Sequence, residues 1–493
     1  MSQSQIRDFY NNQTVLITGG TGFLGKVLIE RLLRTTNIAQ IFVLVRAKKG
    51  KDAQTRLYDM FDNYYYDKVK AQNPNFKSRV SAVEGDCVSD NLGLALQDRE
   101  KLVAKVNVVF HVAATVHLNE NIKSAYKINI GGTENLLKLC QKMKSLKSVI
   151  HVSTAFSNCH LDTIDEVFYN YPLGYDQVKI LLQDLTPPQA EKLSQKMLEG
   201  WPNSYAFTKA LTEAMIASEG KNLPIGVFRP AIVTSTYKDP IENWCDSYGG
   251  PNSILAGAGL GFLRLFPCDT RSYMEVVPVD LTIAALIAIA WDVYKKDKTE
   301  IPVYNYVSSI DNPITYYEFF HLNTIHFPYY PLTRAKWAPK FRTMKKSLPY
   351  HVLTLFYHYI PALLLDFVKI VRFQKPEMLS RIRKVHALFD LFSFYSEKGW
   401  KYSNKNVKLL WERMNEGDRK LYNFDISSVQ WTYYLRYYYK GLRVYLFEDD
   451  LGNLAEAKKK MRRFEFLHSL MLFGIYFLGM NLIWFIFSKI YSS

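Results

Sequence analysis

The segment Thr18-Gly-Gly-Thr-Gly-Phe-Leu-Gly25 follows directly on the apolar, β-branched run Val15–Thr18 and leads into a helical pattern over Lys26–Arg34. Its glycines have the spacing GxxGxxG and are Gly19, Gly22 and Gly25. Glycines between a strand and a helix permit a tight turn, a close backbone approach to a pyrophosphate and close packing of helix on sheet. The segment therefore predicts a dinucleotide-binding βαβ unit near the start of the chain.

Short apolar runs recur along the first 290 residues at the spacing of βα units. Six of them are expected strands: Val15–Thr18, Ile41–Val45, Val80–Val83, Val108–Val112, Val149–Val152 and Ile225–Phe228. Helical patterns such as Lys26–Arg34 and Thr133–Met143 lie between them. This alternation predicts an α/β fold with a Rossmann-type, doubly wound parallel sheet.

The second expected strand ends at Val45 and Arg46, with no acidic residue at this point. An acidic side chain here would bind the ribose 2′-OH of NAD, whereas an arginine accommodates the 2′-phosphate of NADP. We therefore expect NADPH as the cofactor. Asp86, after the third strand, and Ala113 with Ala114, after the fourth, occupy positions expected to flank it, although a turn or small-residue packing explains them equally well.

Tyr205 and Lys209 lie four residues apart, on one face of an expected helix. A lysine ammonium close to a phenol lowers the phenol pKa from ~10 towards working pH. Such a tyrosine can give a proton to a carbonyl oxygen as hydride reaches the carbon. The fifth expected strand ends at Ser153 and Thr154, and either hydroxyl could stabilise a developing oxyanion. Together with the glycine loop, this order of motifs indicates a reductase.

These segments resemble the extended short-chain dehydrogenase/reductases and, more closely, the alcohol-forming fatty acyl-CoA reductases. The resemblance is carried by Thr18–Lys26, Val43–Arg46, His111–Val116, His151–Ala155, Tyr205–Lys209, Arg229–Val233, Val277–Asp280, Asn423–Ile426, Trp431 and Tyr433–Tyr445. It implies reduction of a long-chain fatty acyl-CoA to a primary alcohol, with two NADPH consumed and CoA released. It also implies a helical C-terminal domain.

The resemblance further implies roles for individual residues. Tyr205 and Lys209 would be the catalytic pair, with Thr154 the favoured orienting hydroxyl and Ser153 the second choice. The cofactor would be held by Thr18, Gly19, Gly22, Phe23, Leu24, Gly25, Arg46, Asp86, Ala113, Ala114, Lys209 and Pro230. Two hydride deliveries at one site are expected, the first giving an aldehyde through a hemithioacetal. Acyl transfer through Cys159 is chemically conceivable, but no neighbouring residue indicates a lowered thiol pKa.

Two other functions are compatible with this fold. One is a membrane-anchored reductase of the same superfamily that acts on a sterol or a sugar nucleotide, and the long C-terminal region argues against it. The other is a membrane-tethered lipid-binding protein with a degenerate cofactor site. The intact Tyr205, Lys209 and glycine triplet argue against that loss of catalysis.

The charge of the chain is uneven. Its 493 residues carry 62 Lys+Arg and 46 Asp+Glu, and 48% of them are hydrophobic, which excludes extended disorder. Residues 1–290 hold 31 basic and 28 acidic residues, whereas residues 291–493 hold 31 and 18. The C-terminal excess suits an anionic membrane surface or the phosphates of CoA. No nucleic-acid-binding module is recognised, and the histidines lack metal-ligand spacing, so neither nucleic acid nor metal is expected.

Phe466–Phe487 is a 22-residue run without Asp, Glu, Lys or Arg. At about 1.5 Å per residue it could cross a hydrocarbon core of roughly 30 Å. Five basic residues precede it between Lys458 and Arg463 and only Lys489 follows, so the catalytic part should face the cytosol. We expect a tail anchor in the endoplasmic reticulum membrane, with the peroxisome as the alternative. Leu348–Val371 is also apolar but has polar interruptions, and either a buried helix pair or an interfacial segment would fit it.

The expected organisation follows from these boundaries. A reductase domain would cover residues 1–295, a transition 296–345, a C-terminal domain 346–455 and a transmembrane helix 466–487. The sequence leaves the oligomeric state open, and a homo-oligomer is compatible with it.

Overall fold

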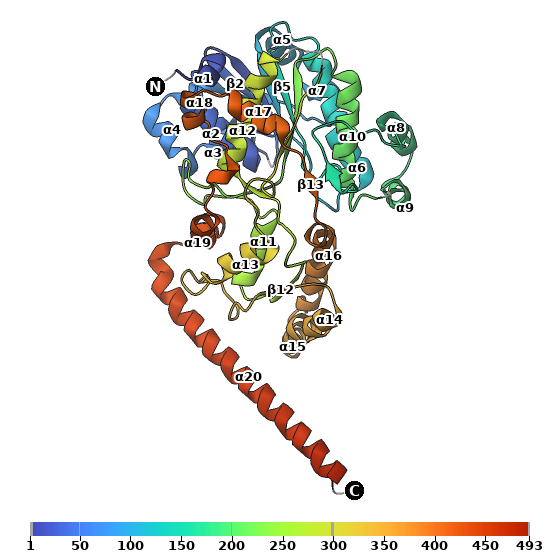
Figure 1. Ribbon diagram of the computed structural model, residues 1–493, viewed down its shortest axis with the longest axis vertical. Coiled ribbons are helices and arrows are strands. Elements are labelled where there is room, and N and C mark those ends of the chain that lie inside the picture. Colours follow the sequence, from blue (N-terminus) through green and yellow to red (C-terminus); the bar gives the residue numbers. More distant parts are fainter. Residues whose placement is uncertain (1–2, 49, 199, 297–299, 492–493) are drawn as a thin grey trace. The chain divides into compact units, whose positions relative to one another are not determined.

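The computed structural model describes residues 3–48, 50–198, 200–296 and 300–491. Its central feature is a parallel sheet surrounded by helices (Figure 1). The sheet has seven strands in the order β11-β7-β5-β4-β1-β2-β3. The strands are β1 Thr14–Thr18, β2 Gln40–Val45, β3 Val80–Glu84, β4 Val108–His111, β5 Ser148–Val152, β7 Ile225–Pro230 and β11 Val303–Tyr306. The predicted parallel α/β fold is confirmed, and the six expected strands agree within two residues at each end. The edge strand β11 lies outside the expected set.

The chain order reverses at β1, which pairs with β2 on one side and with β4 on the other. Ligands of open parallel sheets bind beyond the carboxyl ends of the strands at such a switch point. The glycine segment begins at the carboxyl end of β1 and α2, Phe23–Thr35, follows it. The topology therefore places the predicted dinucleotide-binding turn at the centre of the carboxyl edge.

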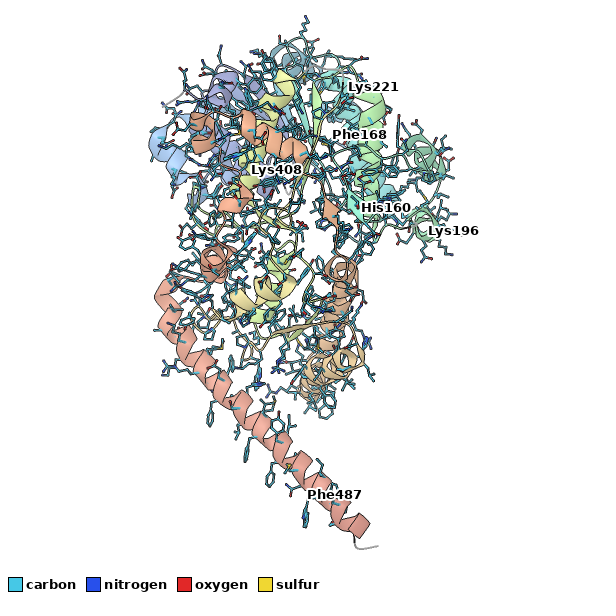
Figure 2. All side chains as sticks on the ribbon, viewed as in Figure 1. His160, Phe168, Lys196, Lys221, Lys408 and Phe487 are labelled. Atoms are coloured by element: carbon cyan, nitrogen blue, oxygen red, sulfur yellow. The ribbon has the colours of Figure 1, made fainter. Side chains whose placement is uncertain are left out.

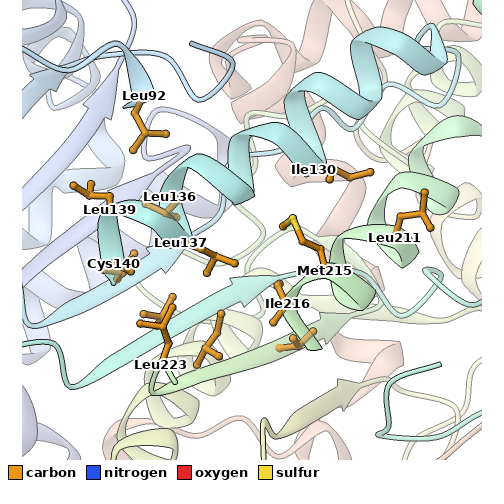
Figure 3. Packing of buried hydrophobic residues seen from close by; sticks show 14 of the residues in the cluster. Leu92, Ile130, Leu136, Leu137, Leu139, Cys140, Leu211, Met215, Ile216 and Leu223 are labelled. Carbon is orange, nitrogen blue, oxygen red and sulfur yellow. The ribbon is translucent and has the colours of Figure 1, made fainter. Parts of the chain in front are cut away.

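Two helices, α7 Gly132–Cys140 and α10 Ser204–Glu219, pack an apolar core onto one face of the sheet (Figure 3). Leu136 and Leu137 of α7 and Met215 and Ile216 of α10 are all at most 1% exposed. Burying side chains of this size is worth about 1.5–3 kcal/mol each. This packing holds α10, which carries Tyr205 and Lys209, rigidly against the sheet.

The chain folds as two compact units that interleave along the sequence. Unit 1 contains residues 1–244, 273–314 and 398–430, and it includes the whole parallel sheet. Its other helices are α1 Gln5–Tyr10, α3 Ala53–Met60, α4 Asp67–Gln72, α5 Leu96–Lys105, α6 Ile122–Tyr126, α8 Tyr175–Gln183, α9 Pro187–Met197, α12 Val279–Lys295, α17 Lys405–Arg413 and α18 Glu416–Leu421. Two short parallel pairs join β8 Ile232–Thr234 to β10 Val276–Pro278 and β6 Thr163–Ile164 to β13 Lys401–Tyr402.

Unit 2 contains residues 245–272, 315–397 and 431–493 and is mainly helical. Its elements are α11 Pro251–Gly259, β9 Leu265–Pro267, α13 Tyr316–Thr324, β12 Arg342–Met344, α14 Leu348–Thr354, α15 Ile360–Val371, α16 Met378–Glu397, α19 Trp431–Gly441 and α20 Leu454–Tyr491. A π-helical turn, Leu355–Tyr359, joins α14 to α15. Within the part of the chain that the structure describes, two stretches are long and apolar enough to cross a membrane, namely Leu348–Val371 and Leu451–Phe485. The expected helical C-terminal region is thus confirmed.

Candidate active site

The glycine turn after β1 leaves no room for a side chain at Gly19 or Gly25. Gly19 has a φ of +72°, and a Cβ there would lie 2.7 Å from the backbone nitrogen of Ala113. A Cβ on Gly25 would collide with the carbonyl oxygen of Gly19. Gly22 is exposed and immediately precedes α2. A backbone this close to solvent, at the first turn of a 13-residue helix, fits the pyrophosphate of a dinucleotide.

Phe23 and Leu24 begin α2 and are both half-buried. The Phe23 ring stacks on Trp244 with centroids 5.8 Å apart, and Trp244 stacks in turn on Tyr65 at 3.8 Å. Aromatic stacking of this kind fixes the direction in which α2 leaves the turn. The first turn of α2 is therefore held in place by packing as well as by its backbone.

A hydrogen-bond chain ties the glycine turn to the end of β4. The Thr133 hydroxyl donates to the Asn129 carbonyl (2.6 Å) and therefore accepts from Nε2 of His111 (2.9 Å). His111 Nδ1 is then an acceptor for the Thr18 hydroxyl (2.7 Å), whose oxygen accepts from Ala113 N–H (3.2 Å). Burial lowers the pKa of His111 to about 3, which keeps the ring neutral in this tautomer. Ala114 follows Ala113 in the same loop and is half-buried.

Arg46 and Asp86 lie together at the ends of β2 and β3. Arg46 NH1 is 3.5 Å from Asp86 Oδ2, and the Arg46 side chain is 61% exposed. An exposed pair of this kind adds little stability. Because the Arg46 side chain is exposed, its guanidinium is accessible to an anionic group at the carboxyl edge of the sheet.

The candidate reacting centre lies on the first turns of α10. Asn203 caps this helix by accepting from Ala206 N–H (3.0 Å), and Tyr205 shares a hydrogen bond with Thr154. Lys209 donates from Nζ to the Val152 carbonyl (2.7 Å) at the end of β5. The helix thus brings the tyrosine, the lysine and a strand-end hydroxyl to one place.

The pKa values differ from the expectation for Tyr205. Burial raises its pKa to about 12, and the hydrogen bond from Thr154 opposes only part of this rise. The expected lowering by Lys209 is wrong for this structure, because desolvation of the phenolate dominates and the contribution that opposes it comes from Thr154. Burial also lowers the pKa of Lys209 to about 8, although the nearby Glu213 carboxylate raises it. Tyr205 is therefore a neutral phenol that can donate a proton.

The Ser153 hydroxyl belongs to a different hydrogen-bond network from that of Thr154 and Tyr205. Its hydroxyl donates to Glu213, which also forms a fully buried ion pair with Arg229 (Oε2 to NH2, 2.6 Å). Arg229 donates further to two main-chain carbonyls in the segment after β6, and its neighbour Pro230 accepts from Ala155 N–H (2.9 Å). Of the two hydroxyls left open by the sequence, Thr154 therefore meets Tyr205 and Ser153 meets Glu213.

Two functional-site residues were missed from the sequence, Glu213 and Asn129. Glu213 lies four residues after Lys209 on the same helical face, and this spacing was a signal that the sequence offered. Its pairing with Arg229 depends on the burial of both side chains, which only the folded chain shows. The Asn129 side chain donates to Thr208 (2.9 Å) and accepts from Thr115 N–H (3.1 Å), and so joins α10 to the loop after β4. No sequence spacing indicated that bridge.

Comparisons with known proteins agree over nearly the whole chain. A family model for an NAD-binding domain, described as "Male sterility protein", matches residues 17–286, and a second model with the same description matches residues 357–449. Fatty acyl-CoA reductase wat of Drosophila melanogaster is 36% identical over 466 residues, which cover 94% of this chain and 90% of the relative. This chain belongs to the fatty acyl-CoA reductase family. Human fatty acyl-CoA reductase 2 is 30% identical, with 97% and 93% of the two chains covered.

Solved structures support the fold of this reductase. The terminal reductase domain of the myxalamid biosynthetic pathway superposes with a TM-score of 0.58 at 16% identity, covering 88% of this chain and 91% of the other. The reductase domain of a Mycobacterium tuberculosis non-ribosomal peptide synthetase gives 0.58 at 18%, covering 88% and 92%. At these identities the likeness concerns the fold alone. The resemblance stated above is confirmed by the relatives, and the protein is an oxidoreductase with a nicotinamide-dinucleotide fold.

Proposed function

We propose that this reductase converts long-chain fatty acyl-CoA to a primary fatty alcohol through a bound aldehyde, consuming two NADPH and releasing CoA. The observation that carries the proposal is the contact between Tyr205 and Thr154, with Lys209 buried beside them and the glycine turn at the same sheet edge. The relatives named fatty acyl-CoA reductase support the substrate class.

The reaction requires an acid and an oxyanion site. A bound nicotinamide cofactor supplies hydride. In the first reduction, the hydroxyls of Thr154 and Tyr205 would hold the thioester oxygen as it gains negative charge. The resulting hemithioacetal releases CoA and leaves the aldehyde. In the second reduction, Tyr205 would donate its proton to the aldehyde oxygen, for which a neutral phenol is the required form. Lys209, held by the Val152 carbonyl, would bind the nicotinamide ribose.

A covalent route through Cys159 is less favourable. Cys159 is fully buried, whereas a nucleophilic thiol needs contact with the substrate. Direct reduction of the thioester needs only the hydroxyls at the sheet edge. We therefore assign no role in the chemistry to Cys159.

NADPH selectivity is assigned to Arg46, whose exposed guanidinium can pair with the 2′-phosphate. Arg46→Ala should raise KM for NADPH at least about tenfold and leave KM for NADH nearly unchanged, because one charge-assisted hydrogen bond is worth ~1.5–3 kcal/mol. Lys51→Ala, which removes an exposed lysine from the same loop, is the matched control. Equal changes in both KM values would refute the assignment.

The membrane attachment proposed for this enzyme is a tail anchor in the endoplasmic reticulum with the catalytic unit in the cytosol. Its support is α20, whose apolar part has exposed side chains such as Phe487 (Figure 2), and the basic cluster Lys458–Arg463 before it. Carbonate extraction checks the anchor, since a full-length protein that leaves the membrane contradicts it. Imaging the tagged chain separates the endoplasmic reticulum from the peroxisome.

The decisive experiment incubates the purified full-length protein with NADPH and acyl-CoAs of graded chain length, and identifies the products. Primary alcohol with two NADPH consumed per molecule supports the proposal. Aldehyde alone, with one NADPH consumed, would contradict the two-step reduction. The absence of turnover on every acyl-CoA would contradict the substrate class and favour a sterol, a sugar nucleotide or a non-catalytic role.

A further inference from the structure

The segment Leu348–Val371 in unit 2 buries mainly polar side chains and exposes apolar ones, the reverse of a helix in a soluble protein. Counted in steps of four residues, its buried positions form one stripe: Tyr350, Thr354, His358, Ala362 and Asp366. Four of these five carry a polar group. In a helix of a soluble protein the buried stripe is apolar and the outer face is polar. Here the polar and small residues face the protein.

His358 and Asp366, two of the ionisable members of the stripe, are hydrogen-bonded inside unit 2. His358 Nε2 accepts from Arg264 N–H (3.1 Å), and its Nδ1 bonds to His386 on α16 (3.0 Å). Asp366 accepts from three backbone N–H groups at the start of α16, those of residues 377, 378 and 379 (2.8–2.9 Å). These bonds fix which face of the helix is turned towards the protein.

The outer face consists of large apolar side chains. Phe356, Leu363, Leu364, Phe367 and Ile370 are between 50% and 64% exposed, and Phe373, just beyond α15, is fully exposed. Phe373 also has a φ of +56°, in the left-handed region that bulky residues rarely adopt. An apolar face of this length on a folded protein marks an interaction surface.

Basic residues border this apolar face. Arg372, Lys375, Arg383 and Lys384 are all exposed in the turn after α15 and on the first half of α16. Between Pro331 and Lys384 the chain has 12 Lys/Arg and two acidic residues. A second copy of this surface would bring the two basic rims together, which like-charge repulsion disfavours. Anionic lipid headgroups are complementary to both features.

We propose that the outer face of residues 348–373 lies in the plane of a membrane surface containing anionic lipid, as a second attachment in addition to α20. The helix cannot span the bilayer in this conformation, because two polar residues of its stripe are hydrogen-bonded to the protein. His358 bonds to Arg264, which directly precedes β9, and to α16, and Asp366 bonds to the start of α16. Its apolar face enters the headgroup–acyl boundary, and the basic rim meets the headgroups. This inference concerns unit 2 and does not rest on the reaction proposed for unit 1.

The test places a polarity-sensitive fluorophore on single cysteines of the full-length protein. Cys87→Ser provides the background, since the other four cysteines are buried. Leu364→Cys reports on the outer face, and Leu478→Cys, in the exposed apolar part of α20, reports on the anchor. Leu96→Cys on α5 of unit 1 is the matched control, because Leu96 is also a strongly exposed leucine (71%, against 61% for Leu364) and charged residues follow it along the chain. Each protein is reconstituted in phosphatidylcholine vesicles with and without phosphatidylserine, using acyl chains brominated near the headgroup.

Bromolipid quenching at Leu364 in the phosphatidylserine vesicles, with none at Leu96, is the expected result. Arg372→Glu with Lys375→Glu should then weaken this quenching severalfold, since each basic residue near an anionic surface contributes about 1 kcal/mol, roughly a fivefold effect. A probe at Leu364 that is open to aqueous iodide while Leu478 is quenched would overturn the docking and leave the anchor intact. A probe at Leu364 could instead be shielded from iodide and yet not be quenched by bromolipid. That result, together with energy transfer between labelled copies, would overturn the membrane docking in favour of self-association.

Discussion

Helix α10 in unit 1 and the segment Leu348–Val371 in unit 2 both bury polar side chains, for opposite reasons. In α10, Thr208, Lys209 and Glu213 are enclosed by other parts of the protein on every side. In Leu348–Val371, a single polar stripe is enclosed while apolar residues such as Leu364 and Phe367 face outwards. The enclosed polar groups of α10 belong to the candidate reacting centre. The one-sided polar stripe of Leu348–Val371 suits a helix whose other face lies in an apolar environment.

A buried polar residue has to be interpreted together with the opposite face of its helix or strand. Around α10 the opposite faces are apolar core, so burying the polar groups costs free energy, and a cluster of this kind is a candidate functional site. On Leu348–Val371 the opposite face is apolar and exposed. The polar groups therefore face the protein because the outer face contacts lipid and not water.

The largest effect is expected for Tyr205→Phe. Loss of the phenol removes the acid of the aldehyde step and one hydrogen bond to the oxyanion, so alcohol formation should fall roughly 10²- to 10⁴-fold. NADPH binding, measured by fluorescence of the bound cofactor, should change little. Tyr126→Phe removes a phenol that donates only to the Tyr175 carbonyl, and it should leave the rate near wild type. Normal turnover by the Tyr205 variant would refute the assignment.

Next in size is Glu213→Gln. It leaves the fully buried Arg229 without a counter-charge, and the loss of one partner of a buried ion pair destabilises by about 3–5 kcal/mol. Thermal unfolding of the purified protein should show this as a markedly lower Tm. Glu219→Gln, at the end of the same helix, should have a small effect because Glu219 only accepts from Tyr175 at the partly exposed surface. A Tm equal to wild type for Glu213→Gln would mean that Arg229 does not need its partner.

The sequence predicted the sheet because each strand is a local run of β-branched residues, and it predicted Tyr205, Lys209 and the glycine turn because each motif is continuous. It could not predict that Glu213 pairs with Arg229 or that Asn129 spans two elements, because those contacts join residues that only the folded chain brings together. The high pKa of Tyr205 depends on burial, which spacing does not reveal.

The segment Leu348–Val371 shows a second kind of limit. In the sequence, His358 and Asp366 read as interruptions of an apolar run. They are eight residues apart and therefore share one face, together with Thr354 and Ala362. Their periodicity was present in the sequence, but whether that face points inwards or outwards depends on α16 and Arg264, which lie outside the segment.

A smaller effect concerns the pH dependence of the reaction. Lys209 has a pKa of about 8, so it loses its proton as the pH rises through that value. If the ammonium binds the nicotinamide ribose, kcat should fall by up to tenfold per pH unit above it. Lys209→Arg remains charged and should lose this alkaline limb even if its rate is low. Glu213→Gln should move the limb to lower pH, because the Glu213 carboxylate raises the Lys209 pKa. A wild-type profile flat to pH 10 would contradict the role of the ammonium.

The smallest effect is expected for Asp366→Ala, on the other side of the comparison. Asp366 caps α16 through three backbone N–H groups, and loss of a helix cap costs about 1 kcal/mol. Hydrogen exchange at residues 377–379 should therefore become several times faster, while the exchange of α10 stays unchanged. Asp390→Ala, further along the same helix α16, is the control, because it removes an exposed ion pair with Lys346 and no bond to the first turn of the helix. If the Asp366 variant exchanged like wild type, the polar stripe would not be what fixes the helix, and the outward direction of its apolar face would need another cause.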